Sequence, residues 1–309
     1  MRVDCALTVP GPSAEELAPR LPDRWRGVFS AVNDRRDPPA ARTDDLQRRL
    51  DEAGLDGAVL VAAPSLSRRL EHGFAEALAL ATNGWLIETY LDRATGLRGT
   101  IFVATIEASI VEAEIARCAR TPFFAQVRFP TGGGYLAGHH ANRPLFVTAA
   151  RQGLPVLIDS HGGERLTGVG PVATTLEIPI ARAHALQAHL TSAVFHGILP
   201  SIPALRLIVA QPGIQWAADM VDRLDRTWNL LGAEIPEITV PPSRQIAEWV
   251  WWLDEAAPGA DSATVGEIIR TLPGSRGATS PTRRGAWDSV DPALLRDLYG
   301  DRAPTPVAA

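Results

Sequence analysis

The sequence predicts an α/β protein built as a (β/α)8 TIM barrel. Apolar runs of strand length alternate with amphipathic stretches of helical spacing, which is the pattern of βα units around a parallel sheet. Eight strand-like runs occur along the chain, and eight parallel strands are the number that closes such a barrel. With 309 residues, 46% of them hydrophobic, the chain is long enough to bury one large core.

The expected elements alternate along the chain. The strands cover residues 3–8, 57–62, 99–104, 123–128, 155–160, 205–210, 248–252 and 276–280. The helices, which have apolar residues at helical spacing, lie near residues 43–53, 67–92, 107–119, 142–152, 177–197, 215–231, 263–271 and 292–299. The last strand is the weakest because glycine is poor in strands. We expect one barrel domain over residues 1–301 and a loose tail over residues 302–309.

The composition excludes several classes of function. No uninterrupted apolar window of about 18 residues occurs, and no basic region precedes a long apolar run at the start, so we expect a cytoplasmic protein without a membrane partner. All 30 Lys+Arg residues are arginine, which excludes a Schiff-base lysine and a carbamylated lysine. The net charge is −5 and the arginines are dispersed, so nucleic acid is not an expected partner. The two cysteines, Cys5 and Cys118, are expected to be buried and structural.

Short motifs along nearly the whole chain point to one family. They are residues 3–5 (VDC), 21–26 (LPDRWR), 83–86 (NGWL), 153–158 (GLPVLI), 195–199 (FHGIL), 205–210 (LRLIVA), 223–228 (RLDRTW), 241–243 (PPS) and 287–288 (WD). In this order they resemble the amidohydrolase-related proteins of the aminocarboxymuconate-semialdehyde decarboxylase type. The resemblance implies an amidohydrolase-like barrel that binds a zinc-like ion at the C-terminal ends of its strands.

The positions where the resemblance places metal ligands carry other residue types. They are Ala6 and Thr8 on the first strand, Asp159 ending the fifth, Gln211 ending the sixth, and Thr282 or Arg283 after the last. Zinc needs about three protein ligands chosen from His, Cys, Asp and Glu, and only Asp159 is of that kind. We therefore expect no metal of the family type and no cofactor.

Asp159 and His161 are the candidate catalytic residues. They lie two apart at the end of the fifth strand, so both side chains point to one face if the strand continues. The carboxylate would then orient the imidazole for proton transfer. The alternative is a turn capped by Asp159 with a solvated His161, because Asp, Ser and Gly all favour turns.

The candidate substrate-binding residues are Arg128, Gln211, Thr8, Tyr135 and Arg283. Arg128 ends the fourth strand, and a guanidinium grips a carboxylate with two hydrogen bonds; the alternative is a buried ion pair with Asp159. Gln211 and Thr8 would either bond a substrate carbonyl or fill the vacated metal space. Tyr135 follows a glycine-rich loop and would cover the pocket.

Three functions remain open. The first is a metal-independent lyase or hydrolase acting on a small carboxylated metabolite, aromatic ones included, with His161 and Asp159 as the proton-transfer pair. The second is a catalytically inactive member that serves as a binding or regulatory partner. The third is a metal-dependent hydrolase or decarboxylase with a relocated site built from Asp159, His161 and one of His139 and His140. We also expect a homodimer, from the resemblance and from outward-facing tryptophans in residues 249–252.

Overall fold

The computed structural model describes residues 3–32, 43–52, 54–62, 71–91, 96–104, 107–132, 134–159, 172–211, 216–254, 267–269 and 292–304. The chain forms two compact units. Unit 1 consists of Met1–Arg128, Gly259–Val265 and Trp287–Ala309, and unit 2 of Phe129–Pro258 and Gly266–Ala286. The single domain expected over residues 1–301 stays a prediction.

Unit 1 contains four parallel strands in chain order. They are β1 (Val3–Thr8), β2 (Gly57–Val61), β3 (Leu97–Ile101) and β4 (Phe124–Arg128). The described helices of this unit are α1 (Ala14–Leu17), η1 (Ala18–Arg20), α2 (Asp23–Val32), α3 (Thr43–Glu52), α4 (His72–Leu86), the π-helix η2 (Ile87–Leu91), α5 (Ala108–Ala119), α10 (Pro292–Tyr299) and η7 (Gly300–Arg302). β2 is buried at all five positions, as expected of a parallel strand covered on both faces.

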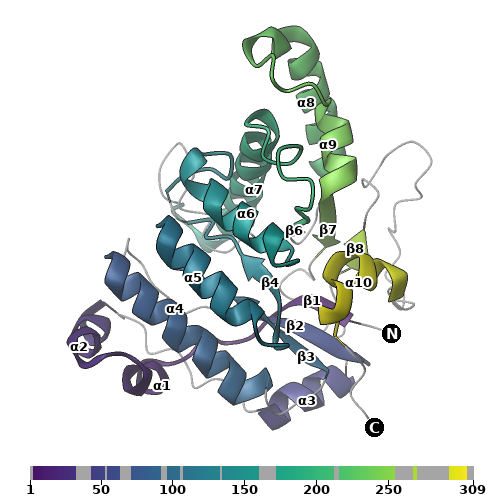
Figure 1. Cartoon of the computed structure of the whole chain (residues 1–309). Helices are drawn as coiled ribbons and strands as arrows, with labels where there is room; N and C mark the ends of the chain where they lie inside the picture. The colour runs from purple at the N-terminus through teal and green to yellow at the C-terminus, as the bar shows by residue number, and fades with distance from the viewer. Residues whose placement is uncertain are drawn as a thin grey trace. The chain divides into compact units, whose positions relative to one another are not determined.

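Gly99 shows which face of this sheet the helices cover. A Cβ atom at Gly99 would lie 2.7 Å from Cδ1 of Leu91 and 3.0 Å from Cδ2 of Leu86. β3 therefore faces α4 and η2 at Gly99, and α5 lies alongside α4 in Figure 1. Because side chains alternate along a strand, Thr100 points to the opposite face of the sheet.

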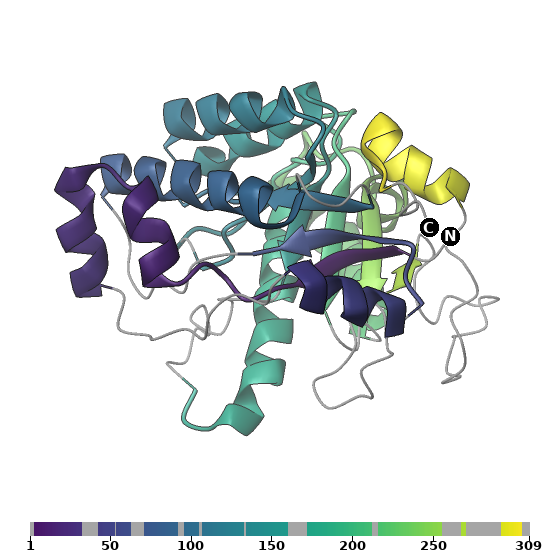
Figure 2. The same ribbon diagram turned by 90° about the horizontal axis from the view of Figure 1, so that it is seen from below.

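Unit 2 contains three parallel strands and one short antiparallel strand. They are β5 (Val156–Asp159), β6 (Leu207–Gln211), β7 (Val250–Asp254) and β8 (Glu267–Ile269), the last of which is antiparallel to β7. The described helices are η3 (His140–Asn142), α6 (Arg143–Arg151), η5 (Thr175–Glu177), α7 (Ile178–Phe195), α8 (Trp216–Leu231), η6 (Gly232–Glu234) and α9 (Pro242–Trp249). α7 extends well beyond the strands of its unit (Figure 2). No helix among the residues that the structure describes is long and apolar enough to cross a membrane.

The predicted alternation of strands and helices is confirmed through β7, with some corrections. β1 has the predicted bounds, whereas β3 ends at Ile101. Residues 263–271 were predicted as a helix, which is wrong for residues 267–269, because Glu267–Ile269 is a strand; its two isoleucines favour strands. The expected strand 276–280 lies outside the described residues.

Three further differences concern helices and the tail. α1, α2 and α9 were not predicted, and α9 includes Trp249, which was expected in a strand. Helix α4 begins only at His72, because Glu71 caps it by accepting from the amides of Gly73 and Phe74. Arg302 was expected to start a loose tail, but it donates hydrogen bonds to backbone carbonyls of its unit, so the chain is fastened at this residue.

The cysteines and the tryptophans of residues 249–252 are buried within the chain. Both cysteines are buried, as predicted, and burial raises the pKa of each thiol. Trp251 and Trp252 are 3% and 1% exposed, and Trp252 packs edge-on against Trp216 of α8. The tryptophans of this region are therefore covered by the chain itself and give no support to the expected homodimer, which stays a prediction.

Candidate functional site

The C-terminal edge of the unit 1 sheet carries two of the predicted substrate-binding residues. Active sites of βα barrels lie at this end of the strands, and Thr8 and Arg128 are the last residues of β1 and β4. Thr8 is the register partner of Val61. Leu60 is the register partner of Gly99, so the next residue, Val61, lies beside Thr100. Both point to the face opposite α4 and η2. Thr8 therefore points to the face of the sheet opposite α4 and η2.

Arg128 points to the same face. Thr100 is the register partner of Gln126, and their side chains are hydrogen-bonded at 2.9 Å. Arg128 lies two residues beyond Gln126, so its side chain points the same way and one level nearer the end of the strand. It is half-buried, and Thr8 is exposed. Unit 1 therefore presents a guanidinium and a hydroxyl at the edge where barrel enzymes bind their ligands.

A buried polar network lies on this face around Gln126, two residues before Arg128 on β4. The Gln126 side chain donates from Nε2 to the hydroxyl of Thr100 and to the carbonyl of Cys5, at 2.9 and 3.0 Å. The phenol of Tyr299, from α10, donates to Gln126 Oε1 at 3.0 Å. Burial raises the pKa of Tyr299 well above its usual value, so the phenol stays a neutral donor. Both ends of the Gln126 amide are thus hydrogen-bonded inside the protein, so this network is the buried layer beneath Arg128; we call it the Gln126 floor.

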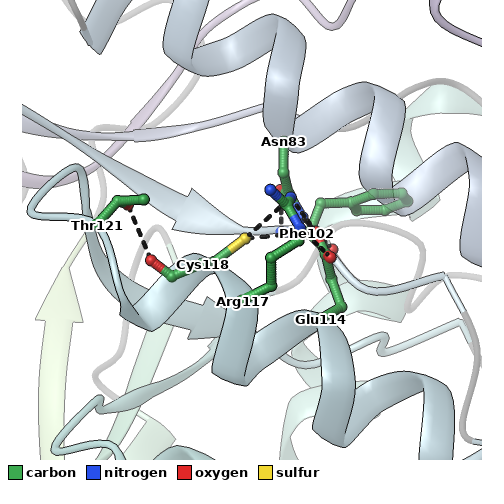
Figure 3. A network of polar contacts seen from close by, with 6 residues as sticks. All are labelled: Asn83, Phe102, Glu114, Arg117, Cys118 and Thr121. Atoms are coloured by element: carbon green, nitrogen blue, oxygen red, sulfur yellow. Dashed lines mark hydrogen bonds and ion pairs between the residues drawn. The ribbon is translucent and has the colours of Figure 1, made fainter.

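A second polar network lies on the helix side of the same sheet (Figure 3). Asn83 of α4 is hydrogen-bonded to both backbone groups of Phe102, the residue that follows β3. The Asn83 amide also donates to Glu114 of α5, which is paired with Arg117. The sequence reasoning missed both networks. The available signals were a glutamine inside a buried strand and an asparagine inside an apolar helix.

The C-terminal edge of the unit 2 sheet carries acidic residues. Asp159 is the last residue of β5 and is 1% exposed. β6 ends at Gln211, whose register partner is Asp254, the last residue of β7. Asp254 was missed because the seventh strand was expected to end at residue 252. His161 lies outside the described residues, so its pairing with Asp159 stays a prediction.

The loop after β4 carries a stack of three rings. The rings of Tyr135 and His139 are 4.1 Å apart and inclined by only 17°, and those of His139 and His140 are 4.2 Å apart. Tyr135 is 38% exposed. It therefore lies at the surface of unit 2, stacked on an imidazole that accepts a hydrogen bond from the backbone of Ala141.

Helix α7 anchors this loop. Its residue His189 is hydrogen-bonded through Nε2 to the carbonyl of Thr131, and its residue Ser192 accepts from the amide of Gly138. Burial lowers the pKa of His189 to about 4, so the imidazole is neutral at pH 7 and its Nε2 carries the donated proton. The glycine-rich loop is thus hydrogen-bonded to α7 at Thr131 and at Gly138, and this limits the positions open to Tyr135.

The residues described at the strand ends do not fit a zinc-like ion. Ala6, a predicted ligand position, is buried and carries no donor atom. Over the part of the chain that the structure describes, no three or more His, Cys, Asp or Glu side chains are grouped so that they could hold a metal ion. The relocated site also needs His161, and the remaining ligand position of the resemblance falls on Thr282 or Arg283; all three lie outside that part.

Comparison with known proteins identifies the family. The amidohydrolase family model matches residues 60–265, and no curated protein matches the chain by sequence. The fold is similar to that of 5-carboxyvanillate decarboxylase from Sphingomonas paucimobilis, with a TM-score of 0.59, 14% identity and coverage of 81% of this chain and 80% of that chain.

Two other solved structures have the same fold. IDCase from Metarhizium anisopliae gives a TM-score of 0.62 at 15% identity, over 81% of this chain and 76% of that chain. Dihydroxybenzoic acid decarboxylase from Polaromonas sp. JS666 was solved with manganese and 2-nitroresorcinol. It gives a TM-score of 0.55 at 16% identity, over 82% of this chain and 78% of that chain. The predicted fold class, an amidohydrolase-like (β/α)8 barrel, is thereby confirmed. Because the family model matches well over half of the sequence, the chain belongs to the amidohydrolase family.

Proposed function

We propose that this protein is a lyase or hydrolase that acts on a small carboxylated metabolite, with aromatic carboxylates as the foremost class, and that it works without the family's metal ion. The observation that carries the proposal is the exchange of residue types at the strand ends. The positions of the first-strand ligands hold Ala6 and Thr8, whereas β4 ends in Arg128 on the same face as Thr8. This edge thus suits an anion better than a cation.

Arg128 serves as the carboxylate anchor in this proposal. A planar guanidinium binds a carboxylate through two parallel, charge-assisted hydrogen bonds. The Thr8 hydroxyl, at the end of β1, is available to a further substrate oxygen. The aromatic substrate class is supported by the two fold neighbours that are decarboxylases of 5-carboxyvanillate and of dihydroxybenzoic acid.

The chemical step is assigned to Asp159 and His161. In a decarboxylation the C–C bond to the carboxyl group breaks, CO2 leaves, and the electron pair stays on the substrate carbon. A positioned acid must then deliver a proton to that carbon. His161 is proposed as this acid, and the buried carboxylate of Asp159 is proposed to orient its imidazole and hold it protonated. In a hydrolysis the same pair would instead take a proton from the attacking water.

The test combines metal content with turnover. Protein purified without chelator is measured by inductively coupled plasma mass spectrometry, and hydroxylated benzoates are screened for CO2 release with and without EDTA. We expect no stoichiometric divalent ion and turnover that EDTA does not change. One divalent ion per chain, removed by EDTA together with the activity, would overturn the proposal in favour of a relocated metal site.

One observation favours a second function, an inactive member that only binds carboxylates. Ala6 fills a ligand position with an apolar side chain, as expected if the chemistry were lost and the fold kept. The same screen separates the two functions. Saturable binding of a benzoate without any CO2 release or hydrolysis would favour the binding function, and turnover abolished by His161→Ala would favour the enzyme.

A further inference from the structure

The backbone of Phe102, just after β3, is hydrogen-bonded to the side chain of Asn83. In a sheet, a neighbouring strand would normally supply these hydrogen bonds. The side chain of Asn83 accepts from the Phe102 amide at 2.9 Å and donates to the Phe102 carbonyl at 3.0 Å. The N–H and C=O of one strand residue point toward the same neighbour. β2 ends at Val61, beside Thr100, so Phe102 lies past the end of that neighbour. Asn83 replaces the missing partner strand with one amide.

Glu114 fixes the orientation of the Asn83 amide. Its Nδ2 donates at 2.7 Å to Oε1 of Glu114, which is 4% exposed. A carboxylate only accepts hydrogen bonds, so Nδ2 must face it and Oδ1 is left for the Phe102 amide. Glu114 also accepts two hydrogen bonds from Arg117, each 2.7 Å long, and one from the thiol of Cys118 (Figure 3). This network ties α4, α5 and the end of β3 together.

Phe102 is thereby placed on the face that carries Arg128. Thr100 points to the face opposite α4 and η2, and Phe102 is two residues further along the chain. The register of Ile101 with Val127, carried on by one residue, puts Phe102 beside Arg128. In Figure 3 the phenyl ring leaves the network on the side opposite to Cys118. Phe102 is half-buried, whereas Phe29 and Phe124 of the same unit are fully buried, so part of Phe102 is exposed.

We propose that Phe102 selects for an aromatic ring in the substrate and that Asn83 is the positioning residue that holds Phe102 in place. The inference rests on the proposed function, because it takes Arg128 as the anchor of the substrate carboxylate. Neighbouring strands are about 4.8 Å apart, and aromatic rings pack at centroid distances of about 4.5 to 7 Å. A benzoate whose carboxylate is bound by Arg128 thus brings its ring within packing distance of Phe102.

The experiment measures ring selectivity by isothermal titration calorimetry. The probes are benzoate and cyclohexanecarboxylate, which share the carboxylate and differ in whether the ring is aromatic. The wild type is expected to bind benzoate about fivefold more tightly, in keeping with the usual strength of an aromatic pair. Phe102→Leu is expected to bring this ratio close to one by weakening benzoate alone, and Phe102→Tyr, which keeps a ring, is expected to preserve it.

Asn83→Leu tests the positioning role and Phe29→Leu is the matched control. Asn83→Leu is expected to lower the ratio as Phe102→Leu does, since it frees the backbone of Phe102. Phe29→Leu removes a buried ring of α2 that packs against Phe74 of α4, and is expected to lower stability without changing the ratio. Circular dichroism checks that each variant is folded. A purely structural role of Asn83 would lower the melting temperature and leave the ratio intact, which would overturn the positioning role.

The remaining outcomes separate this inference from the proposed function. An unchanged ratio in folded Phe102→Leu would overturn the selectivity role while leaving the carboxylate anchor in place. If wild type binds neither probe, or if Arg128→Gln leaves both affinities unchanged, the anchor itself is wrong and the proposed function fails with it. A ratio lost in Phe102→Leu and preserved in Phe102→Tyr, together with loss of both affinities in Arg128→Gln, would support both the selectivity role and the carboxylate anchor.

Discussion

His189 is a buried base whose protonation the folded protein disfavours. Burial lowers its pKa to about 4, and the hydrogen bond to Thr131 only partly opposes this. The ordinary pKa of histidine is about 6.5, so between pH 6.5 and 4 the unfolded chain binds a proton that the native state does not. The free energy of unfolding therefore falls as the pH drops through this window, by about 3 kcal/mol at most from this residue.

Replacing His189 is expected to remove this part of the acid sensitivity. In His189→Gln the difference in the free energy of unfolding between pH 7 and pH 4.5, measured by urea denaturation, should shrink by about 2 kcal/mol. His184 is exposed on the same helix, and His184→Gln serves as the control that should leave the difference unchanged. An equal difference in wild type and His189→Gln would mean that His189 is not buried as a neutral base.

Helix α10 and the turn after it fasten the end of the chain to unit 1. Tyr299 donates to Gln126 at 3.0 Å, and Arg302 donates to the carbonyls of Ala119, Thr121 and Phe124. The carbonyls of Ala119 and Thr121 lie at the end of α5, and that of Phe124 at the start of β4. The turn after α10 is thus hydrogen-bonded to the N-terminal edge of the sheet. In barrels, residues at this end contribute to stability and not to catalysis.

Tyr299→Phe is expected to lower the free energy of unfolding by about 1 to 3 kcal/mol, because Gln126 Oε1 is then left buried without its donor. Tyr135→Phe is the matched control: its ring lies at the surface, and the same change should cost less than about 0.5 kcal/mol. Both values come from urea denaturation at pH 7. A loss in Tyr299→Phe no larger than in the control would show that the Gln126 floor does not depend on α10.

Sequence periodicity predicts the elements of this fold better than it predicts their contacts. The strands were located because their apolar runs are local, and Thr8, Arg128 and Asp159 were placed at strand ends for the same reason. The polar networks join residues distant in sequence, such as Asn83 with Phe102, 19 positions apart, and Tyr299 with Gln126, 173 positions apart. No local pattern marks such pairs, because each forms only when the sheet and its helices have assembled.

Boundaries failed where a short segment fits two structures. Trp249 belongs to the end of α9 although the tryptophans after it form β7, because an apolar run of this length suits a buried helix and a buried strand equally. The error had a consequence for the site, since a seventh strand that ends at residue 252 leaves out Asp254. A shift of two residues at one boundary thus left out an acidic residue at the C-terminal edge of the unit 2 sheet.

The molecule as a whole is expected to fold and remain stable without a divalent ion. An ion that binds only the native state raises the melting temperature, and its removal lowers it. Here the first-strand ligand positions hold Ala6 and Thr8, and the guanidinium of Arg128 disfavours a cation at the same edge. Dialysis against EDTA should therefore shift the melting temperature by less than about 1 °C, since no appreciable binding free energy is lost.

The chelator experiment needs a control for the effect of EDTA itself, and EDTA preloaded with zinc provides it. Differential scanning calorimetry of the two samples should give superimposable transitions, and added zinc or manganese should not raise the melting temperature. A drop of several degrees in EDTA, reversed by one of these ions, would reveal a native-state metal. The ligands would then have to include residues other than Ala6 and Thr8. His161 and Asp159 would be the first two residues to substitute in order to find them.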